Sequence, residues 1–67
     1  MQKTVEEFYS IDEDALAEKS CQSEYWQNCL DFYLQNKMKP INALSKKQAD
    51  WLQKIEDQLE EDYVKNG

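Results

Sequence analysis

The clearest pattern of hydrophobic and polar positions lies in the last third of the chain. Apolar residues recur there every three or four positions, which places them within about 120° of arc on a helix. Just upstream, Ser45 and Gln48 have the spacing of a capping box, in which two side chains satisfy free amides at a helix start. The pattern predicts an amphipathic helix over about 46–64 with one apolar stripe: Trp51, Leu52, Ile55, Leu59 and Tyr63.

A second helix is predicted over about 23–37, and its apolar stripe is much wider. The stripe spans about 180–200° of arc, whereas an ordinary surface helix needs about half of that. Either the helix is covered on two sides, or part of its aromatic surface stays open for a partner or a second copy. The candidate interface aromatics are Tyr25, Trp26, Phe32 and Tyr33.

The segment between these two helices is short and contains Pro40. Proline lacks an amide hydrogen and restricts the residue before it, so one uninterrupted helix is excluded. A short connection between helices favours antiparallel neighbours. We therefore expect an antiparallel helical hairpin built from residues 23–37 and 46–64.

The N-terminal third allows two interpretations, because Thr4 and Ser10 each precede a glutamate by three positions, as in a capping box. Residues 3–18 could form one helix with a shared apolar face. Alternatively, Ser10 caps a helix over about 11–19, and residues 1–10 form a less ordered or separately packed arm. We adopt the second interpretation.

Composition favours an all-α fold. One glycine and one proline leave little material for the turns of an all-β fold, and 40% hydrophobic residues argue for a folded chain. The predicted fold is one small domain over 1–67, a three-helix bundle made of the hairpin and an N-terminal helix or arm. So short a chain buries only roughly 60% of its unfolded surface, so we expect a surface function rather than a deep catalytic cavity.

The residue types that carry most catalysis and metal binding are missing. All eight basic residues are lysines, so there is no histidine to act as a base or ligand and no arginine to clamp phosphate. The carboxylates lie in strongly charged segments, whereas a catalytic carboxylate needs burial or a close partner. We therefore expect no enzymatic activity, no metal and no cofactor.

Cys21 and Cys29 are the two cysteines. On a single helix they would lie about 12 Å apart along the axis, too far for a disulfide. We expect two reduced thiols and a cytoplasmic protein. No stretch has the length and apolar character of a signal peptide or a membrane span.

Charge is distributed unevenly along the chain, which has 14 acidic and 8 basic residues and a net charge of −6. Folding the hairpin gathers lysines at its turn and carboxylates at its other end. We call the first group the basic hinge: Lys37, Lys39, Lys46 and Lys47. We call the second group the acidic pole: Asp12, Glu13, Asp14, Asp57, Glu60, Glu61 and Asp62.

Both ends of the last helix carry the less favourable charge for a helix dipole, at a cost of only about a few tenths of a kcal/mol each. The charges either keep a small protein soluble, or the acidic pole meets a basic partner and the basic hinge a separate acidic one. The basic hinge could support weak, salt-sensitive nucleic-acid binding. The net charge opposes such binding, and no arginine is present to recognise bases.

The stretch LSKKQADWLQKI is preceded by EYWQNCLDFYL, an aromatic- and leucine-rich segment. Together, over residues 24–55, they resemble a two-helix pattern of small phage and mobile-element proteins, LS-x-KQ-x-x-WL-x-KI after an aromatic helix and a turn. The resemblance implies a phage or plasmid origin. Small acidic helical proteins of that origin include anti-CRISPR and anti-restriction inhibitors. The matching residues are Leu44, Ser45, Lys47, Gln48, Trp51, Leu52, Lys54 and Ile55.

The sequence thus predicts a small acidic, non-catalytic protein that binds another protein. Inhibitors of the class it resembles occlude a nucleic-acid site or a subunit contact of a host protein. An acidic surface can compete for a basic DNA-binding site through the same long-range field, as a DNA mimic. The alternative is a structural or assembly module that forms a homodimer through the aromatic face of the second helix. Direct nucleic-acid binding and membrane contact are not expected.

Overall fold

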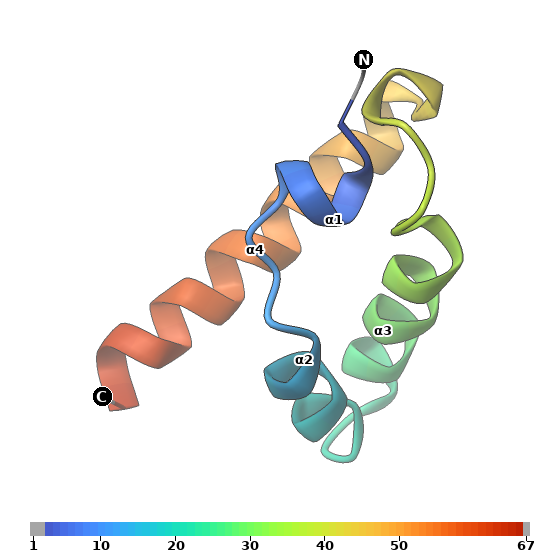
Figure 1. Ribbon diagram of the computed structural model, residues 1–67. Coiled ribbons are helices and arrows are strands. Elements are labelled where there is room, and N and C mark those ends of the chain that lie inside the picture. Colours follow the sequence, from blue (N-terminus) through green and yellow to red (C-terminus); the bar gives the residue numbers. More distant parts are fainter. Residues whose placement is uncertain (1–2, 67) are drawn as a thin grey trace.

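The computed structural model describes residues 3–66, which form an all-α fold, as the composition predicted. Four α-helices and one 3₁₀ helix follow one another, and no strand forms among these residues (Figure 1). Thr4 and Pro40 form an isolated antiparallel bridge. In chain order the helices are α1 (Val5–Phe8), α2 (Glu13–Ser20), α3 (Glu24–Asn36), η1 (Ile41–Ala43) and α4 (Lys46–Asn66).

Side-chain caps fix the starts of the two long helices where the sequence predicted them. The Trp26 amide donates to Ser23 Oγ at 3.3 Å, so α3 begins directly after Ser23. At α4, the Ser45 amide donates to Gln48 Oε1 at 2.9 Å, and the Gln48 amide donates to Ser45 Oγ at 3.2 Å. These reciprocal bonds confirm the predicted capping box.

The start of α2 differs from the prediction. Asp12, not Ser10, caps this helix, because Asp12 Oδ1 accepts from the amides of Asp14 at 3.0 Å and Ala15 at 3.2 Å. The Ser10 amide instead donates to Glu56 Oε2 on α4 at 2.8 Å. Aspartate is as good an N-cap as serine. The helix therefore begins two residues later than expected.

The N-terminal segment, expected as an arm over 1–10, packs against the rest of the chain wherever it is described. The first two residues lie outside the described range. Of the two forms expected for this arm, less ordered or separately packed, the packed form is closer to the structure. Val5 is fully buried, and its amide donates to the Lys39 carbonyl at 2.9 Å. The Glu6 amide donates to the Lys37 carbonyl at 3.1 Å, so α1 is attached to the connection that follows α3.

A capping interaction stabilises α1 despite its short length. The amide and the hydroxyl of Thr4 both donate to Glu7 Oε1, at 3.2 and 3.0 Å. The bond from the amide, and then the bond from the hydroxyl, lower the pKa of Glu7 because they favour its ionised form. The first of the two predicted N-terminal capping boxes therefore forms, and the second does not.

The core lies between α2, α3, α4 and the N-terminal segment. Residues ahead of α2 supply a third of the buried apolar side chains in this core. Burial of each large apolar side chain contributes about 1.5–3 kcal/mol, so this share is large for so small a chain. The buried apolar residues are Val5, Tyr9, Ile11, Leu16, Cys29, Tyr33, Leu52, Ile55 and Leu59. The N-terminal segment is thus a structural component of the domain.

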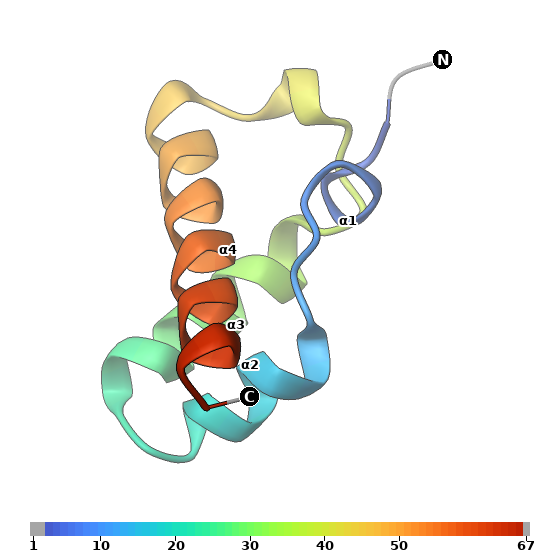
Figure 2. The same cartoon turned by 90° about the vertical axis from the view of Figure 1, so that its left-hand side faces the viewer.

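The predicted antiparallel hairpin, and with it the three-helix bundle, is not confirmed. α2 packs closely along α3, whereas α3 and α4 diverge from their connection. Figure 2 shows α4 crossing α3 at a wide angle rather than lying along it. The N-terminal segment contributes the buried side chains of Val5, Tyr9 and Ile11 to the core between these helices.

Coverage of α3 on two sides agrees with its wide apolar stripe. Cys29 and Tyr33 are buried in the core. Toward α4, the Phe32 ring stacks on Trp51 with ring centroids 4.3 Å apart. Trp26 is half-buried and packs against the core.

The apolar stripe of α4 is only partly buried. Leu52, Ile55 and Leu59 belong to the core, and Trp51 is half-buried, but Tyr63 is 79% exposed. The last turns of α4 extend past α2 in Figure 1, which agrees with the high exposure of Tyr63. The exposed Tyr63 ring lines a groove between α4 and the segment that leads into α2.

Candidate interaction surface

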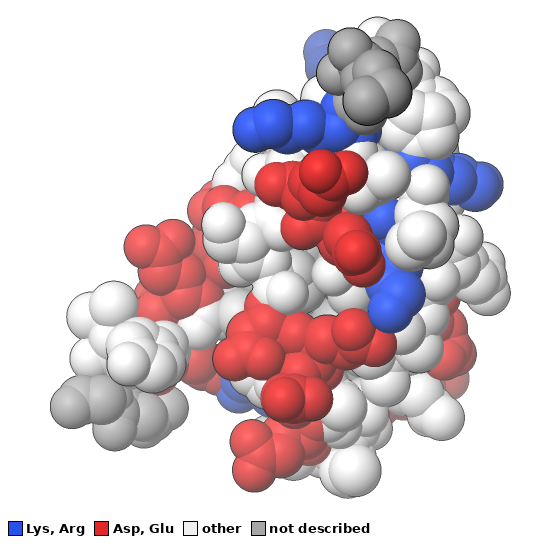
Figure 3. Space-filling model, in the orientation of Figure 1, with Lys and Arg blue, Asp and Glu red and all other residues white. Residues whose placement is uncertain are grey.

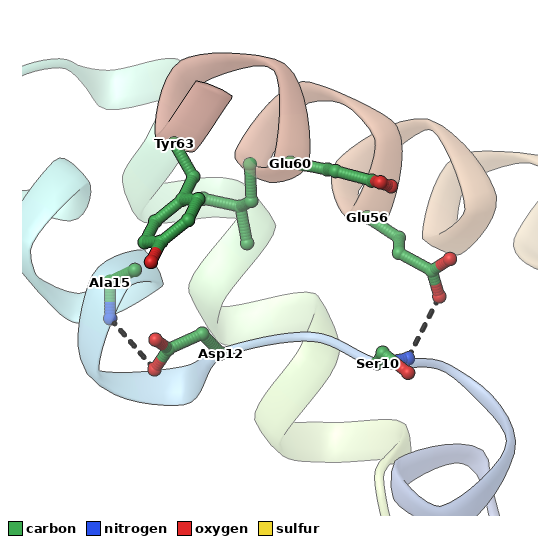
Figure 4. A pocket seen from close by; sticks show the side chains of 7 residues that line it. Ser10, Asp12, Ala15, Glu56, Glu60 and Tyr63 are labelled. Atoms are coloured by element: carbon green, nitrogen blue, oxygen red, sulfur yellow. Dashed lines mark hydrogen bonds between the residues drawn. The ribbon is translucent and has the colours of Figure 1, made fainter. Parts of the chain in front are cut away.

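A groove lies between the second half of α4 and the segment that leads into α2 (Figure 4). Its volume is about 410 Å³, which is within the size range of sites that hold a ligand or an inserted side chain. The lining residues come from both ends of the chain, and only folding brings them together. They are Ser10, Asp12, Ala15, Glu56, Leu59, Glu60 and Tyr63.

The wall opposite α4 is fixed by contacts on both sides of Ser10. Tyr9 and Ile11 are buried, and the Tyr9 hydroxyl donates to the Ala49 carbonyl at 3.3 Å. Successive side chains of an extended segment point to opposite sides, so Ser10 lies on the outer side, where it is exposed. The hydrogen bond from the Ser10 amide to Glu56 attaches this wall to α4.

The other wall is one face of α4. Glu56, Glu60 and Tyr63 are spaced by four and three positions, which places them on the same side of a helix. Leu59, 8% exposed, forms the apolar floor between them. The Tyr63 ring is directed across the groove toward Ala15 (Figure 4). The groove therefore combines an apolar floor, an aromatic ring and acidic edges.

The groove is negatively charged, because three carboxylates and no lysine line it. Asp12 and Glu56 already accept hydrogen bonds from backbone amides. Glu60 forms no hydrogen bond or ion pair with any described residue. Burial raises the pKa of Tyr9, and the negative charges of Glu56 and Asp50 raise it further. The three carboxylates that line the groove would favour a cation there.

Lys19, which lines an adjoining hollow, is already engaged by other groups. A shallower hollow beyond Ala15 and Tyr63 contains Lys19, which forms a salt bridge with Asp62. The Lys19 ammonium also lies 5.3 Å from the centroid of the Trp26 ring. Its charge is therefore held by Asp62 and the indole, at one end of the groove.

Only part of the predicted acidic pole meets at the groove. Asp12 and Glu60 line it, and Asp14 is exposed in the first turn of α2. Figure 3 shows carboxylates gathered on one face over α1, α2 and α4. Glu61 and Asp57 do not line the groove. Glu61 forms an ion pair with Lys65, with Oε1 and Nζ 3.5 Å apart, and Asp57 accepts a hydrogen bond from Gln53 at 3.2 Å, each within one turn of α4.

One salt bridge links the acidic pole to the basic hinge. Lys37 of the hinge forms a salt bridge with Glu13 of the pole, with Nζ and Oε2 3.3 Å apart. This pair exists because α2 packs along α3, an arrangement that the hairpin argument did not include. Lys39, Lys46 and Lys47 are exposed and form no ion pair within residues 3–66.

The four candidate interface aromatics have different environments. Tyr33 is 3% exposed and belongs to the core, so it cannot contribute to an interface. Trp26 is half-buried beside Lys19, and Phe32 is half-buried. Tyr25 is 44% exposed, and burial, followed by the neighbouring Cys29, raises its pKa.

Sequence reasoning missed Ser10 and Leu59 as members of the site. Glu56 lies one helical turn before Glu60 and shares its face, so the sequence already groups it with the carboxylates at this end of the chain. Ser10 gave no such signal. Its contact with Glu56 spans 46 positions, and no local pattern encodes a contact of that range.

The two cysteines are both free thiols, but they do not share a helix as the distance argument assumed. Cys21 is exposed at the C-terminal cap of α2, and Cys29 is buried in α3. Among residues 3–66, no group of three or more potential ligand side chains could hold a metal ion. No helix in that range is both long and apolar enough to cross a membrane.

Tyr33 is expected to give the fold an alkaline pH dependence. Burial raises its pKa above the ordinary 10.0, and the charges of Glu6 and Glu13 raise it further. A tyrosine whose pKa is higher in the folded than in the unfolded state makes its full contribution to stability at any pH below the unfolded-state pKa. That contribution is lost as the pH rises through the folded-state pKa. Above pH 10, the free energy of unfolding should fall more steeply in wild type than in Tyr33→Phe, by up to about 1.4 kcal/mol per pH unit. Urea unfolding at several pH values measures both slopes, and equal slopes would contradict the expectation.

The groove has the chemistry to receive a long basic side chain. The methylene stem of a lysine or arginine packs on apolar surface while its charged end stays near polar groups. Leu59 and Tyr63 provide the first kind of contact, and Glu60 provides the second. Comparison of the chain with protein-family models, curated proteins and solved structures found no match.

Proposed function

We propose that this protein is a small acidic, non-catalytic module that binds a host protein with a basic surface. One observation carries the proposal, the groove between α2 and α4, where acidic side chains surround an apolar floor. Oppositely charged surfaces attract at long range, and apolar contact then adds affinity at short range. The partner we propose therefore presents a lysine or arginine on a protruding segment.

Glu60 is the residue we expect to contact the partner's cation. It has no partner of its own among the described residues, so an incoming ammonium or guanidinium gains an ion pair without displacing one. Asp12 and Glu56 add to the negative field while they continue to hold the groove walls. Tyr63 offers an exposed ring face for the same cation.

We further propose that the partner is a nucleic-acid-binding protein or complex, which this protein inhibits as a DNA mimic. Sites that bind nucleic acid are electropositive, and a chain with net charge −6 is drawn to them. The resemblance of residues 24–55 to small phage proteins supports an anti-defence role. In that role the protein acts in the host cytoplasm, where the free thiols of Cys21 and Cys29 stay reduced.

Affinity capture tests this proposal. The tagged chain, incubated with nuclease-treated bacterial lysate at low and moderate salt, is expected to retain a nucleic-acid-binding protein. With that partner purified, Glu60→Lys should weaken binding by about tenfold or more, because like charges then meet at the interface. The partner's own nucleic-acid ligand should compete with the wild-type protein for binding.

Asp31→Lys is the matched control. Asp31 is exposed on α3 and lines neither the groove nor the hollow that contains Lys19. Its replacement by lysine changes the net charge by the same amount as Glu60→Lys does. Once the effect of net charge on affinity has been corrected for with measurements at different salt concentrations, the Asp31→Lys variant should bind the partner as tightly as wild type does. Equal loss of affinity in both variants would show that the groove is not the binding site. A partner that nucleic acid fails to displace would exclude the DNA-mimic role.

A further inference from the structure

A second candidate surface lies on the other side of α4, where this helix meets the start of α3. A shallow hollow of about 280 Å³ is lined there by Tyr25, Asp50, Trp51 and Lys54. Trp51 precedes Glu56 and Glu60 by five and nine positions, which places it on a different side of the helix from the acidic groove. We call this surface the aromatic patch, and Phe32, stacked on Trp51, adjoins it.

The aromatic patch is held rigidly. The Tyr25 hydroxyl donates to Gln58 Oε1 on α4 at 3.1 Å. The rings of Phe32 and Trp51 are nearly parallel, with an interplanar angle of 16°. Tryptophan and tyrosine dominate the binding energy of protein interfaces, and rings that are already fixed lose little entropy when covered. The patch therefore has the composition and the rigidity of an interface centre.

The charges beside the patch are complementary to each other. Asp50 and Lys54 are one helical turn apart, with Trp51 between them, and both are exposed. Neither side chain forms a hydrogen bond or an ion pair with any described residue. Lys46 and Lys47 precede them, so the first half of α4 is not acidic, although the chain as a whole is.

Such an arrangement is complementary to a copy of itself. In a two-fold contact the same patch is used twice, so residue i of one copy meets residue j of the other, and the reverse. When two α4 helices cross antiparallel near Trp51, Asp50 of each copy faces Lys54 of the other. Two ion pairs then flank two tryptophans, and the acidic grooves stay on the outer sides of the pair.

We propose that a second copy of this chain covers the aromatic patch and forms a two-fold homodimer. Trp51 lies beside the symmetry axis, and the Asp50–Lys54 pairs set the antiparallel register. This dimer is independent of the groove's partner, and it presents two acidic grooves at once. A target with two basic sites would then be bound with higher avidity.

Sedimentation equilibrium over micromolar to millimolar concentrations tests the dimer. Wild type is expected to dimerise reversibly. Asp50→Lys and Lys54→Asp should each weaken the dimer by about tenfold or more, because like charges then meet twice. An equimolar mixture of these two variants should dimerise again, since each chain then opposes the other with the complementary charge. Both sites are exposed, and circular dichroism verifies that the variants fold.

Glu61→Lys and Lys65→Asp serve as controls, because they make comparable charge changes on α4 away from the patch. Both should dimerise as wild type does. Three outcomes would overturn the proposal: a wild-type monomer at millimolar concentration, a dimer that neither Asp50→Lys nor Lys54→Asp weakens, or a mixture of these variants that stays monomeric.

Discussion

Replacing Leu52 by alanine is expected to lower the free energy of unfolding by about 2–5 kcal/mol. Leu52 is fully buried in the first half of α4 and belongs to the core cluster, to which α1, α2 and α3 also contribute. The substitution removes buried methyl groups and leaves a cavity that a tightly packed interior fills only in part.

An effect of this size is large for this protein. A chain of 67 residues has a total stability of about 3–10 kcal/mol, so the variant should be partly unfolded at room temperature or close to it. The melting temperature is expected to fall by about 10–30 °C. Thermal and urea unfolding, followed by far-UV circular dichroism, measure both quantities.

Leu34→Ala provides the matched control. The chemical change is identical and the position is also helical, but Leu34 is 43% exposed on α3. Less apolar surface is lost and no enclosed cavity forms, so the cost should stay below about 1 kcal/mol. If both substitutions destabilised equally, Leu52 would not occupy the core position described.

Val5→Asp has the second of the two largest expected effects. Val5 is fully buried in α1, and its own amide and that of Glu6 already donate to backbone carbonyls, so a carboxylate at this position would be taken out of water without them. An unpaired buried charge costs about 3–5 kcal/mol in proteins, or forces the segment out of the core. Either response should lower the free energy of unfolding in urea titrations by a comparable amount.

Phe8→Asp separates burial from the mere presence of a new charge in the same helix. Phe8 is 51% exposed, so aspartate there can remain in water. This variant should lose about 1 kcal/mol or less. Similar stabilities for Val5→Asp and Phe8→Asp would show that the N-terminal segment does not belong to the core.

The position of the N-terminal segment also matters for the groove. Ser10 and Asp12 form one of its walls, and they are held in place by the burial of Tyr9 and Ile11 on either side of Ser10. The proposed binding surface thus depends on the packing of a segment whose residues up to position 10 were expected to form a less ordered or separately packed arm. Folding of this segment and formation of the groove are the same event.

Local patterns predicted the elements well where the deciding interactions are short-range. The caps at Ser23 and Ser45 act on amides within three positions, and Pro40 acts on its immediate neighbours. The same kind of pattern failed at Ser10, because a second acceptor, Asp12, was nearby and a distant glutamate took the Ser10 amide. Competing caps cannot be ranked without knowing where the rest of the chain lies.

By itself, the sequence determined that this protein is helical, acidic and without histidine or arginine, and where its two long helices begin. Tertiary structure alone decided that α2 packs along α3, that Lys37 pairs with Glu13, and that Ser10 meets Glu56 across the groove. The physical reason is range. Helix periodicity and capping depend on neighbours within one turn, whereas a groove or a salt bridge between elements depends on how separate apolar faces share one small core.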